Sequence, residues 1–292
     1  MFTVGKLFHL AHLVDDLDVV DRWYDDIFAC QRFYRSYERA ARREASLLVI
    51  SDMLMEPILP SRAPEDGGTP LAKFHARFGN RLHSIAWYVD DITEFSAHLG
   101  TLGLRQVGLT GKPVTDPATA VAVWTHPRET HALLEFCEPG FAKDPRLDAG
   151  WSAAFWRDQH PLGIERTSHI SCLFDHVEDA DGTYVEALGG RFVGAADRPD
   201  SLRRYYAVGE ETVIEAVQPL DPNTDEGRDF ARNGEGVFSL TFATKDLAQA
   251  TRFLQEQAQP FRSTTPNTIW LDLDPGFGLR VAFTDTPAPN GR

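Results

Sequence analysis

Histidines and glutamates recur at matching places in this 292-residue sequence, and both are side chains that can transfer protons or bind metal ions. Four apolar segments each run into a short turn, and aligning them on that turn gives one column of residues: His9, Ser84, His169 and Ser239. Later β-rich runs carry Glu135 and Glu215. Glu135 lies between Leu134 and Phe136, and a carboxylate on such a strand is costly to bury without a partner. We therefore expect Glu135 to be functional.

The column residues lie on predicted strands that lead into helices. The strands cover residues 7–14, 82–89, 168–174 and 238–243. Apolar residues then recur at helical spacing, and after the third strand these are Val177, Ala180, Tyr184 and Leu188. Three other helices begin after predicted N-caps, namely Asp16, Asp91 and Asp246. About three short strands follow each helix, so one unit is repeated four times, and residues 71–78 add a helix between the first two units.

Composition narrows the class of partner. The net charge of −14 repels phosphate backbones and anionic lipid headgroups, so we expect a small-molecule partner, no nucleic acid and no membrane. No window approaches 18 apolar residues. With three cysteines, no CxxC spacing and no signal-length apolar segment, we expect a cytoplasmic protein.

The repeated unit resembles the βαβββ module of the vicinal oxygen chelate superfamily, which includes glyoxalase I, methylmalonyl-CoA epimerase, extradiol dioxygenases and bleomycin resistance proteins. The first half looks most like the epimerase, through residues 69–74, 81–92, 123–127 and 133–136. The resemblance implies an α+β fold in which four modules form two glyoxalase-like domains with open, curved, mixed β-sheets. The domains would be residues 1–140, with modules 6–60 and 81–140, and residues 164–287, with modules 164–220 and 235–287.

The resemblance also implies a place for a divalent metal ion: Zn, Fe, Mn and Co are not distinguished, and a protein without metal stays open. Family ligands lie at four places per domain, which here hold His9, Met53, Ser84 and Glu135 in the first half. In the second half they hold His169, Glu215, Ser239 and Ala282. His9 with Glu135 is the first candidate metal pair, and His169 with Glu215 is the weaker one. Two protein ligands hold a metal weakly.

A shift of the first closing strand would turn Glu56 into the cleft beside His9 and Glu135. We therefore name Glu135 and Glu56 as catalytic candidates and Ser84, His126 and Ser239 as substrate-binding candidates. His9 could instead be a hydrogen-bonded groove residue. His12 and His83 lie on the opposite strand face and are expected to be structural. The cluster of Arg39, Arg42 and Arg43 fits a solvated charged face better than an anion site.

Three functions stay open at this point. The first is a metal-dependent isomerase, epimerase or lyase that polarises a small carbonyl compound and moves its proton with a carboxylate. The second is an extradiol-type ring-cleaving dioxygenase, although Ser239 and Ala282 stand at two of its three ligand places. The third is a metal-free binding or resistance protein. A monomer and a homodimer are both compatible with four modules.

Overall fold

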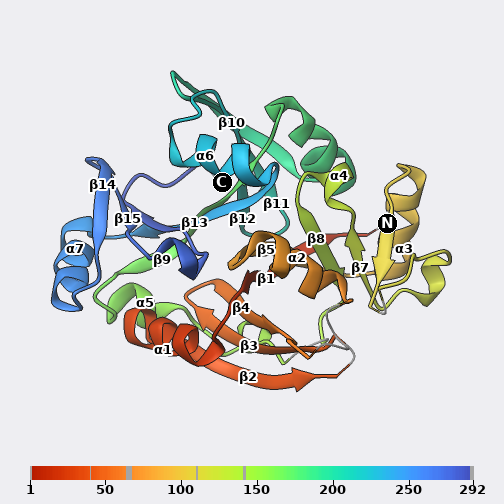
Figure 1. Cartoon of the computed structure of the whole chain (residues 1–292), viewed down its shortest axis with the longest axis horizontal. Coiled ribbons are helices and arrows are strands. Elements are labelled where there is room, and N and C mark those ends of the chain that lie inside the picture. The colour runs from red at the N-terminus through yellow and green to blue at the C-terminus, as the bar shows by residue number, and fades with distance from the viewer. Residues whose placement is uncertain (1, 40, 64–67, 110, 141–142, 290–292) are drawn as a thin grey trace.

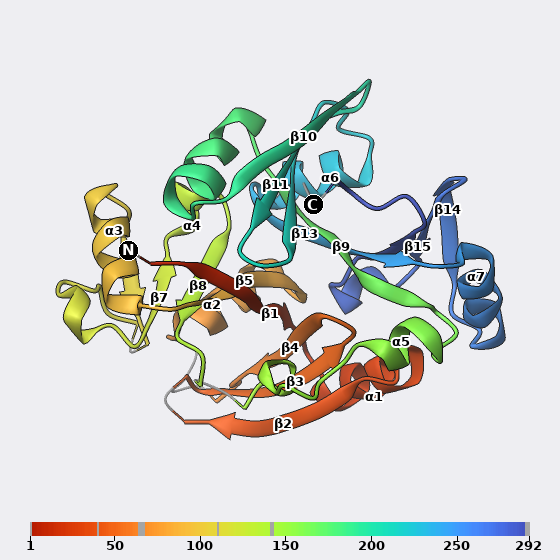
Figure 2. The same ribbon diagram turned by 180° about the vertical axis from the view of Figure 1, so that it is seen from behind.

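The computed structural model describes residues 2–39, 41–63, 68–109, 111–140 and 143–289. Their strands form two mixed eight-stranded sheets, which Figures 1 and 2 show from opposite sides. The first sheet has the order β2-β3-β4-β1-β5-β8-β7-β6, and the second has the order β10-β11-β12-β9-β13-β16-β15-β14. The matching orders confirm that one unit is repeated four times.

The strands of the first sheet are β1 (Val4–Leu13), β2 (Gln31–Glu38), β3 (Arg43–Ile50), β4 (Met53–Pro60), β5 (Arg81–Val89), β6 (Gln106–Gly108), β7 (Ala122–Thr125) and β8 (Leu133–Cys137). Those of the second sheet are β9 (Ile164–Leu173), β10 (Arg191–Arg198), β11 (Ser201–Val208), β12 (Thr212–Pro219), β13 (Gly236–Thr244), β14 (Phe261–Thr265), β15 (Thr268–Leu271) and β16 (Val281–Thr284). In each sheet the opening strands of two units are antiparallel neighbours at the centre, β1 with β5 and β9 with β13.

The α-helices are α1 (Leu17–Phe28), α2 (Pro70–Phe78), α3 (Ile92–Thr101), α4 (Pro127–Thr130), α5 (Ala154–Asp158), α6 (Asp225–Asn233) and α7 (Leu247–Glu256). The predicted caps are confirmed, since the side chains of Asp16, Asp91 and Asp246 accept hydrogen bonds from the backbone N–H three residues on. The helix predicted over residues 71–78, between the first two units, is confirmed as α2.

The helix predicted after the third strand is not an α-helix. A 3₁₀ turn covers Val177–Asp179 and a π-helix covers Gly182–Ala187. Gly182 and Thr183 are weak α-helix formers, and the preceding residue at the turn, His176, makes no side-chain cap hydrogen bond. The apolar spacing therefore predicted the buried face correctly, with Val177, Ala180 and Tyr184 inside, but not the helix type.

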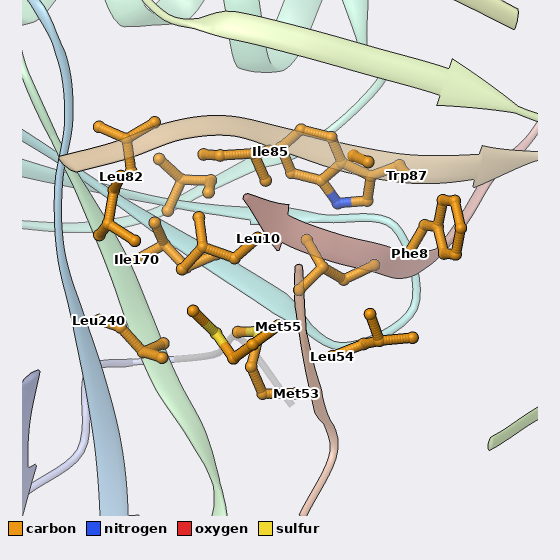
Figure 3. Close-up of a cluster of buried hydrophobic side chains, with 14 of the residues drawn as sticks. Phe8, Leu10, Met53, Leu54, Met55, Leu82, Ile85, Trp87, Ile170 and Leu240 are labelled. Carbon is orange, nitrogen blue, oxygen red and sulfur yellow. The ribbon is translucent and has the colours of Figure 1, made fainter. Parts of the chain in front are cut away.

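The two sheets share one hydrophobic core. Figure 3 shows Ile170 and Leu240 of the second sheet among Leu10, Met53 and Met55 of the first. The segment between the sheets adds to this junction, because the buried Trp156 of α5 donates its indole N–H to the Phe28 carbonyl of α1 at 2.8 Å. Helices α1 and α5 accordingly lie side by side in both views (Figures 1 and 2).

The other face of each sheet lies away from this junction and is covered by a helix. On the first sheet Leu71 and Phe74 of α2 pack against Ala11 and Ile58. On the second sheet, Phe230 of α6 packs in the same way against a separate cluster, formed by Leu173, Val217 and Phe238. Because side chains alternate along a strand, His9 points to the helix-covered face when Leu10 points to the shared core. The same alternation puts His169 on the helix-covered face of the second sheet.

Candidate functional site

Three ionisable side chains meet on the helix-covered face of the first sheet. His9 of β1 places its Nε2 3.1 Å from Oε2 of Glu56 and 3.3 Å from Oε2 of Glu135. Glu56 comes from β4 and Glu135 from β8, so three different strands supply the cluster. The three residues are only 2%, 3% and 6% exposed, respectively. The structure thus brings together the residues that the sequence singled out, including the alternative Glu56.

The strand register explains why Glu56 rather than Met53 occupies this face. In the first sheet Ala11 of β1 pairs with Glu56 of β4, and in the second sheet Ser171 of β9 pairs with Glu215 of β12. Glu56 is therefore the counterpart of Glu215. The assignment of Met53 to the ligand column is wrong, because Met53 is fully buried in the shared core.

Two further residues hold the carboxylates. Arg43 donates from Nη2 to Oε1 of Glu56 at 2.8 Å and from Nε to Glu38 at 2.7 Å. Trp124 of β7 donates its indole N–H to Oε2 of Glu135 at 3.0 Å, the same oxygen that faces His9. The interpretation of Arg43 as part of a solvated face is therefore wrong. No local signal separated it from Arg42, since its contact with Glu56 depends on the pairing of β3 with β4.

The charges of the cluster are coupled. Burial opposes the charged form of His9, but the carboxylates of Glu56 and Glu135 outweigh it and raise the pKa of the imidazole. Burial raises the pKa of Glu56, even though Arg43 and His9 favour its anion. Burial acts on Glu135 in the same direction, yet His9, Arg43 and the Trp124 hydrogen bond together lower its pKa. The cluster therefore combines a carboxyl group that loses its proton more readily, one that holds its proton more tightly, and an imidazole whose charged form is favoured.

A divalent metal ion does not fit this arrangement well. Among the described residues, no group of three or more His, Cys, Asp or Glu side chains is arranged to hold a metal ion. Arg43 sits on Glu56, and a fixed cation there repels a second positive charge. The oxygen of Glu135 that faces His9 already accepts the Trp124 N–H. The acid–base chemistry of the cluster is therefore assigned to its own side chains.

The second sheet carries a related but different set. His169 Nε2 lies 3.5 Å from Oε2 of Glu215. The carboxylate of Glu215 accepts hydrogen bonds from Ser171 at 2.5 Å, Arg203 at 2.9 Å and Tyr205 at 3.0 Å. Despite burial, His169, Arg203 and Ser171 lower the pKa of Glu215 to about 2, whereas burial lowers the pKa of His169. This carboxylate is an anion held by three hydrogen bonds.

The remaining predicted residues are placed as follows. Ser84 is buried on β5, and the register of β5 with β1 puts it on the face of His9. Ser239 is buried on the corresponding face of the second sheet, so it lies apart from the first cluster. The structure does not bring His126 into the cluster: its Nδ1 caps α4 by accepting the Arg128 N–H.

The two histidines expected to be structural lie in different places. His12 is fully buried and its Nε2 is 2.8 Å from the Phe277 carbonyl, with Tyr24 at its other ring nitrogen. His83 packs its ring against Phe74 of α2, the helix that covers the face of His9, so the prediction that His83 lies on the opposite face is wrong. The β1–β5 register shifts between Leu10 and His12, and this irregularity interrupts the alternation on which the prediction relied. Burial lowers the pKa values to about 4 for His12 and about 3 for His83, so both are neutral packing residues at pH 7.

Comparison with known proteins places the fold. A mutant of 4-hydroxymandelate synthase from Streptomyces coelicolor matches with a TM-score of 0.70 at 12% identity, over 99% of this chain and 96% of that one. Methylmalonyl-CoA epimerase from Mycobacterium tuberculosis matches 47% of this chain and 89% of its own at 22% identity and a TM-score of 0.38. A hypothetical protein from Bacillus halodurans matches 48% of this chain and 97% of its own, at 24% identity and a TM-score of 0.40. The sequence matches no protein-family model. No curated protein matches it either.

The full-length match and the two sheets of repeated modules confirm the fold expected from the sequence. The chain has a two-domain glyoxalase-like fold, the fold of the 4-hydroxymandelate synthase structure that it matches over its full length. At this identity the likeness establishes the fold and leaves the activity to the site. In the part of the chain that the structure covers, no helix has the length and hydropathy to cross a bilayer.

Proposed function

We propose that this protein is an acid–base enzyme of the isomerase, epimerase or lyase type, which moves a proton on the carbon beside a carbonyl group of a small substrate. The observation that carries the proposal is the convergence of His9, Glu56 and Glu135 within 3.3 Å on a buried face. Two carboxyl groups with oppositely shifted pKa values are the arrangement that lets one act as base and the other as acid.

Each residue has a distinct role in this proposal. Glu135 is the most exposed of the three and is ionised, so it takes the proton from the carbon. Glu56, whose pKa is raised, carries a proton that it returns to the substrate. His9 lies between both carboxyl groups and passes a proton from Glu135 back to Glu56, which restores the starting state. Its positive charge and that of Arg43 stabilise the negative charge that develops on the substrate oxygen.

Hydrogen exchange tests this proposal with a panel of compounds, so the natural substrate need not be identified first. The purified protein is incubated in D₂O with small ketones, 2-hydroxy ketones and 2-methyl thioesters, and loss of the proton beside the carbonyl is followed by NMR. We expect catalysed exchange for at least one class. Glu135→Gln should slow it by about 100-fold or more, because a positioned base contributes that much. Glu211→Gln, which changes a largely buried carboxyl outside both sheets' clusters, serves as the matched control and should retain the exchange rate.

Two results would overturn the proposal. One is the absence of catalysed exchange with every class, in particular if a small organic molecule copurifies, which would support the binding-protein alternative. The other is exchange that disappears after chelation and returns with a divalent ion, because the mechanism proposed here needs no metal. Metal content measured by inductively coupled plasma mass spectrometry on the same samples separates these cases.

A further inference from the structure

The two sheets place equivalent residues at equivalent register positions. In the first sheet Trp124 of β7 pairs with Glu135 of β8. In the second sheet Trp270 of β15 pairs with Ala282 of β16. Paired residues carry their side chains on the same face, so Trp270 and Ala282 are the counterparts of Trp124 and Glu135.

The second sheet therefore keeps the groups that surround a carboxylate but lacks the carboxylate itself. In the first sheet Glu135 accepts the Trp124 N–H at 3.0 Å and lies 3.3 Å from His9. The second sheet has an indole at the same place in Trp270 and an imidazole in His169. Ala282 is fully buried and ends in a methyl group where Glu135 continues into a carboxyl group.

Two hydroxyl groups on the same face add hydrogen-bonding capacity. Thr241 of β13 pairs with His169 of β9, and Ser239 pairs with Ser171. The hydroxyl oxygens of Ser239 and Thr241 are buried and have no hydrogen-bond partner among the described residues. The register position of Thr241 is held in the first sheet by Ala86, the partner of Glu135. A buried hydroxyl without a partner costs free energy, so this pair of hydroxyls indicates a hydrogen-bonding ligand.

The charges around His169 favour an anion. Arg203, Arg198 and Arg166 each act on the imidazole as positive charges. The nearest carboxylate, Glu215, already accepts from Arg203, Ser171 and Tyr205. An incoming anion thus meets arginines and hydroxyl donors on a face whose own carboxylate is compensated.

We propose that the second sheet binds the carboxylate group of a small organic acid beside Trp270, His169, Ser239 and Thr241, in the place that Glu135 fills in the first sheet. The carboxylate accepts the Trp270 N–H and the two hydroxyl protons. The inference concerns the second sheet alone and does not depend on the acid–base activity proposed for the first.

Acetate is the probe for this site, with acetamide as its neutral counterpart of the same shape. Acetate is titrated into the whole protein while the indole N–H signals are followed by ¹H–¹⁵N NMR. We expect saturable shifts of the Trp270 signal with acetate and none with acetamide. Thr241→Val removes one hydroxyl at nearly constant shape and should weaken acetate binding by about tenfold, as should Trp270→Phe. Trp124→Phe is the matched control in the first sheet and should bind acetate as the wild type does.

Ala282→Glu gives a second test, because it supplies the carboxylate from the chain and should abolish acetate binding in a protein that remains folded. Should this variant fail to fold, the Thr241→Val and Trp270→Phe titrations decide the matter alone. Equal binding of acetate and acetamide would overturn the carboxylate assignment. Binding that is unaffected by Thr241→Val and Trp270→Phe, or no saturable binding at all, would overturn the site.

Discussion

Replacing Arg43 tests whether Glu56, the proposed acid, becomes a buried anion compensated by Arg43 once the pH is high enough to remove its proton. Arg43 is the cation that contacts Glu56, at 2.8 Å, and only 4% of the Glu56 side chain is exposed. Arg43→Met keeps much of the side-chain length and removes the charge. Among the residues that the structure describes, His9 would then remain as the ion-pair partner of Glu56. We expect the variant to fold less stably, and more so at high pH.

The magnitude follows from the cost of breaking a buried ion pair, which is about 3–5 kcal/mol when one partner is removed. We expect about 3 kcal/mol at pH 8, since His9 still compensates part of the charge. Burial already raises the pKa of Glu56 against Arg43, so without Arg43 the pKa rises further. A carboxyl whose pKa is raised in the folded state stabilises the fold only while it is protonated. The loss should therefore shrink to about 1 kcal/mol near pH 5.

Urea unfolding at pH 5 and pH 8 measures the free energy of unfolding of the wild type, Arg43→Met, Glu56→Gln and the double variant. The double variant should recover most of the loss at pH 8, because the buried carboxylate is gone and Glu38, the other partner of Arg43, is 27% exposed and can be solvated. A loss that is equal at both pH values and is not recovered by Glu56→Gln would refute the placement of a charged Glu56 beside Arg43.

Two other predictions concern the segments around the sheets. Arg146 is buried, pairs with Asp144 at 2.6 Å and donates to the carbonyls of Leu7 and Phe8. Arg146→Ala should therefore lower the free energy of unfolding in urea by about 3–5 kcal/mol, whereas Arg157→Ala, at an exposed position, should change it little. Similar small effects of both variants would show that the segment of Arg146 does not stabilise the first sheet. Burial raises the pKa of Glu211 from its ordinary 4.5 to about 7. The protonated carboxyl therefore stabilises the fold at low pH, and this stabilisation is lost as the pH rises from about 4.5 through 7. Glu211→Gln should thus match wild type near pH 4 and exceed its stability by about 3 kcal/mol at pH 8 in thermal or urea unfolding; parallel pH profiles would contradict this.

Local patterns carried most of the fold prediction. The strand and helix periods differ, so the opening strands and α1, α3 and α7 could be read from the sequence, and their aspartate caps need only the three residues that follow. Glu135 was recognisable because its two apolar neighbours on β8 leave a lone carboxylate to be explained. The same strand alternation placed His12 correctly on the face opposite His9 but failed for His83, because the β1–β5 register shifts beside it.

Nonlocal contacts account for what the sequence did not reveal. Met53, Leu54 and Met55 are all apolar, so alternation cannot say which of them shares a face with Glu56, and only pairing with β1 settles the register. Arg43 resembles its exposed neighbours in sequence, and its partner Glu56 lies on the next strand. Trp124 likewise becomes part of the site only through pairing of β7 with β8.

The charge state of His9 decides whether the three side chains form a working acid–base cluster, and NMR titration measures it. The imidazole of ¹⁵N-labelled, chelator-treated protein is followed in the wild type and in Glu135→Gln. We predict that His9 titrates above the ordinary value of 6.5 in the wild type, because two carboxylates surround it, and that its pKa falls in the variant. A wild-type His9 that stays neutral down to acidic pH, or a pKa that Glu135→Gln leaves unchanged, would contradict the proposed cluster.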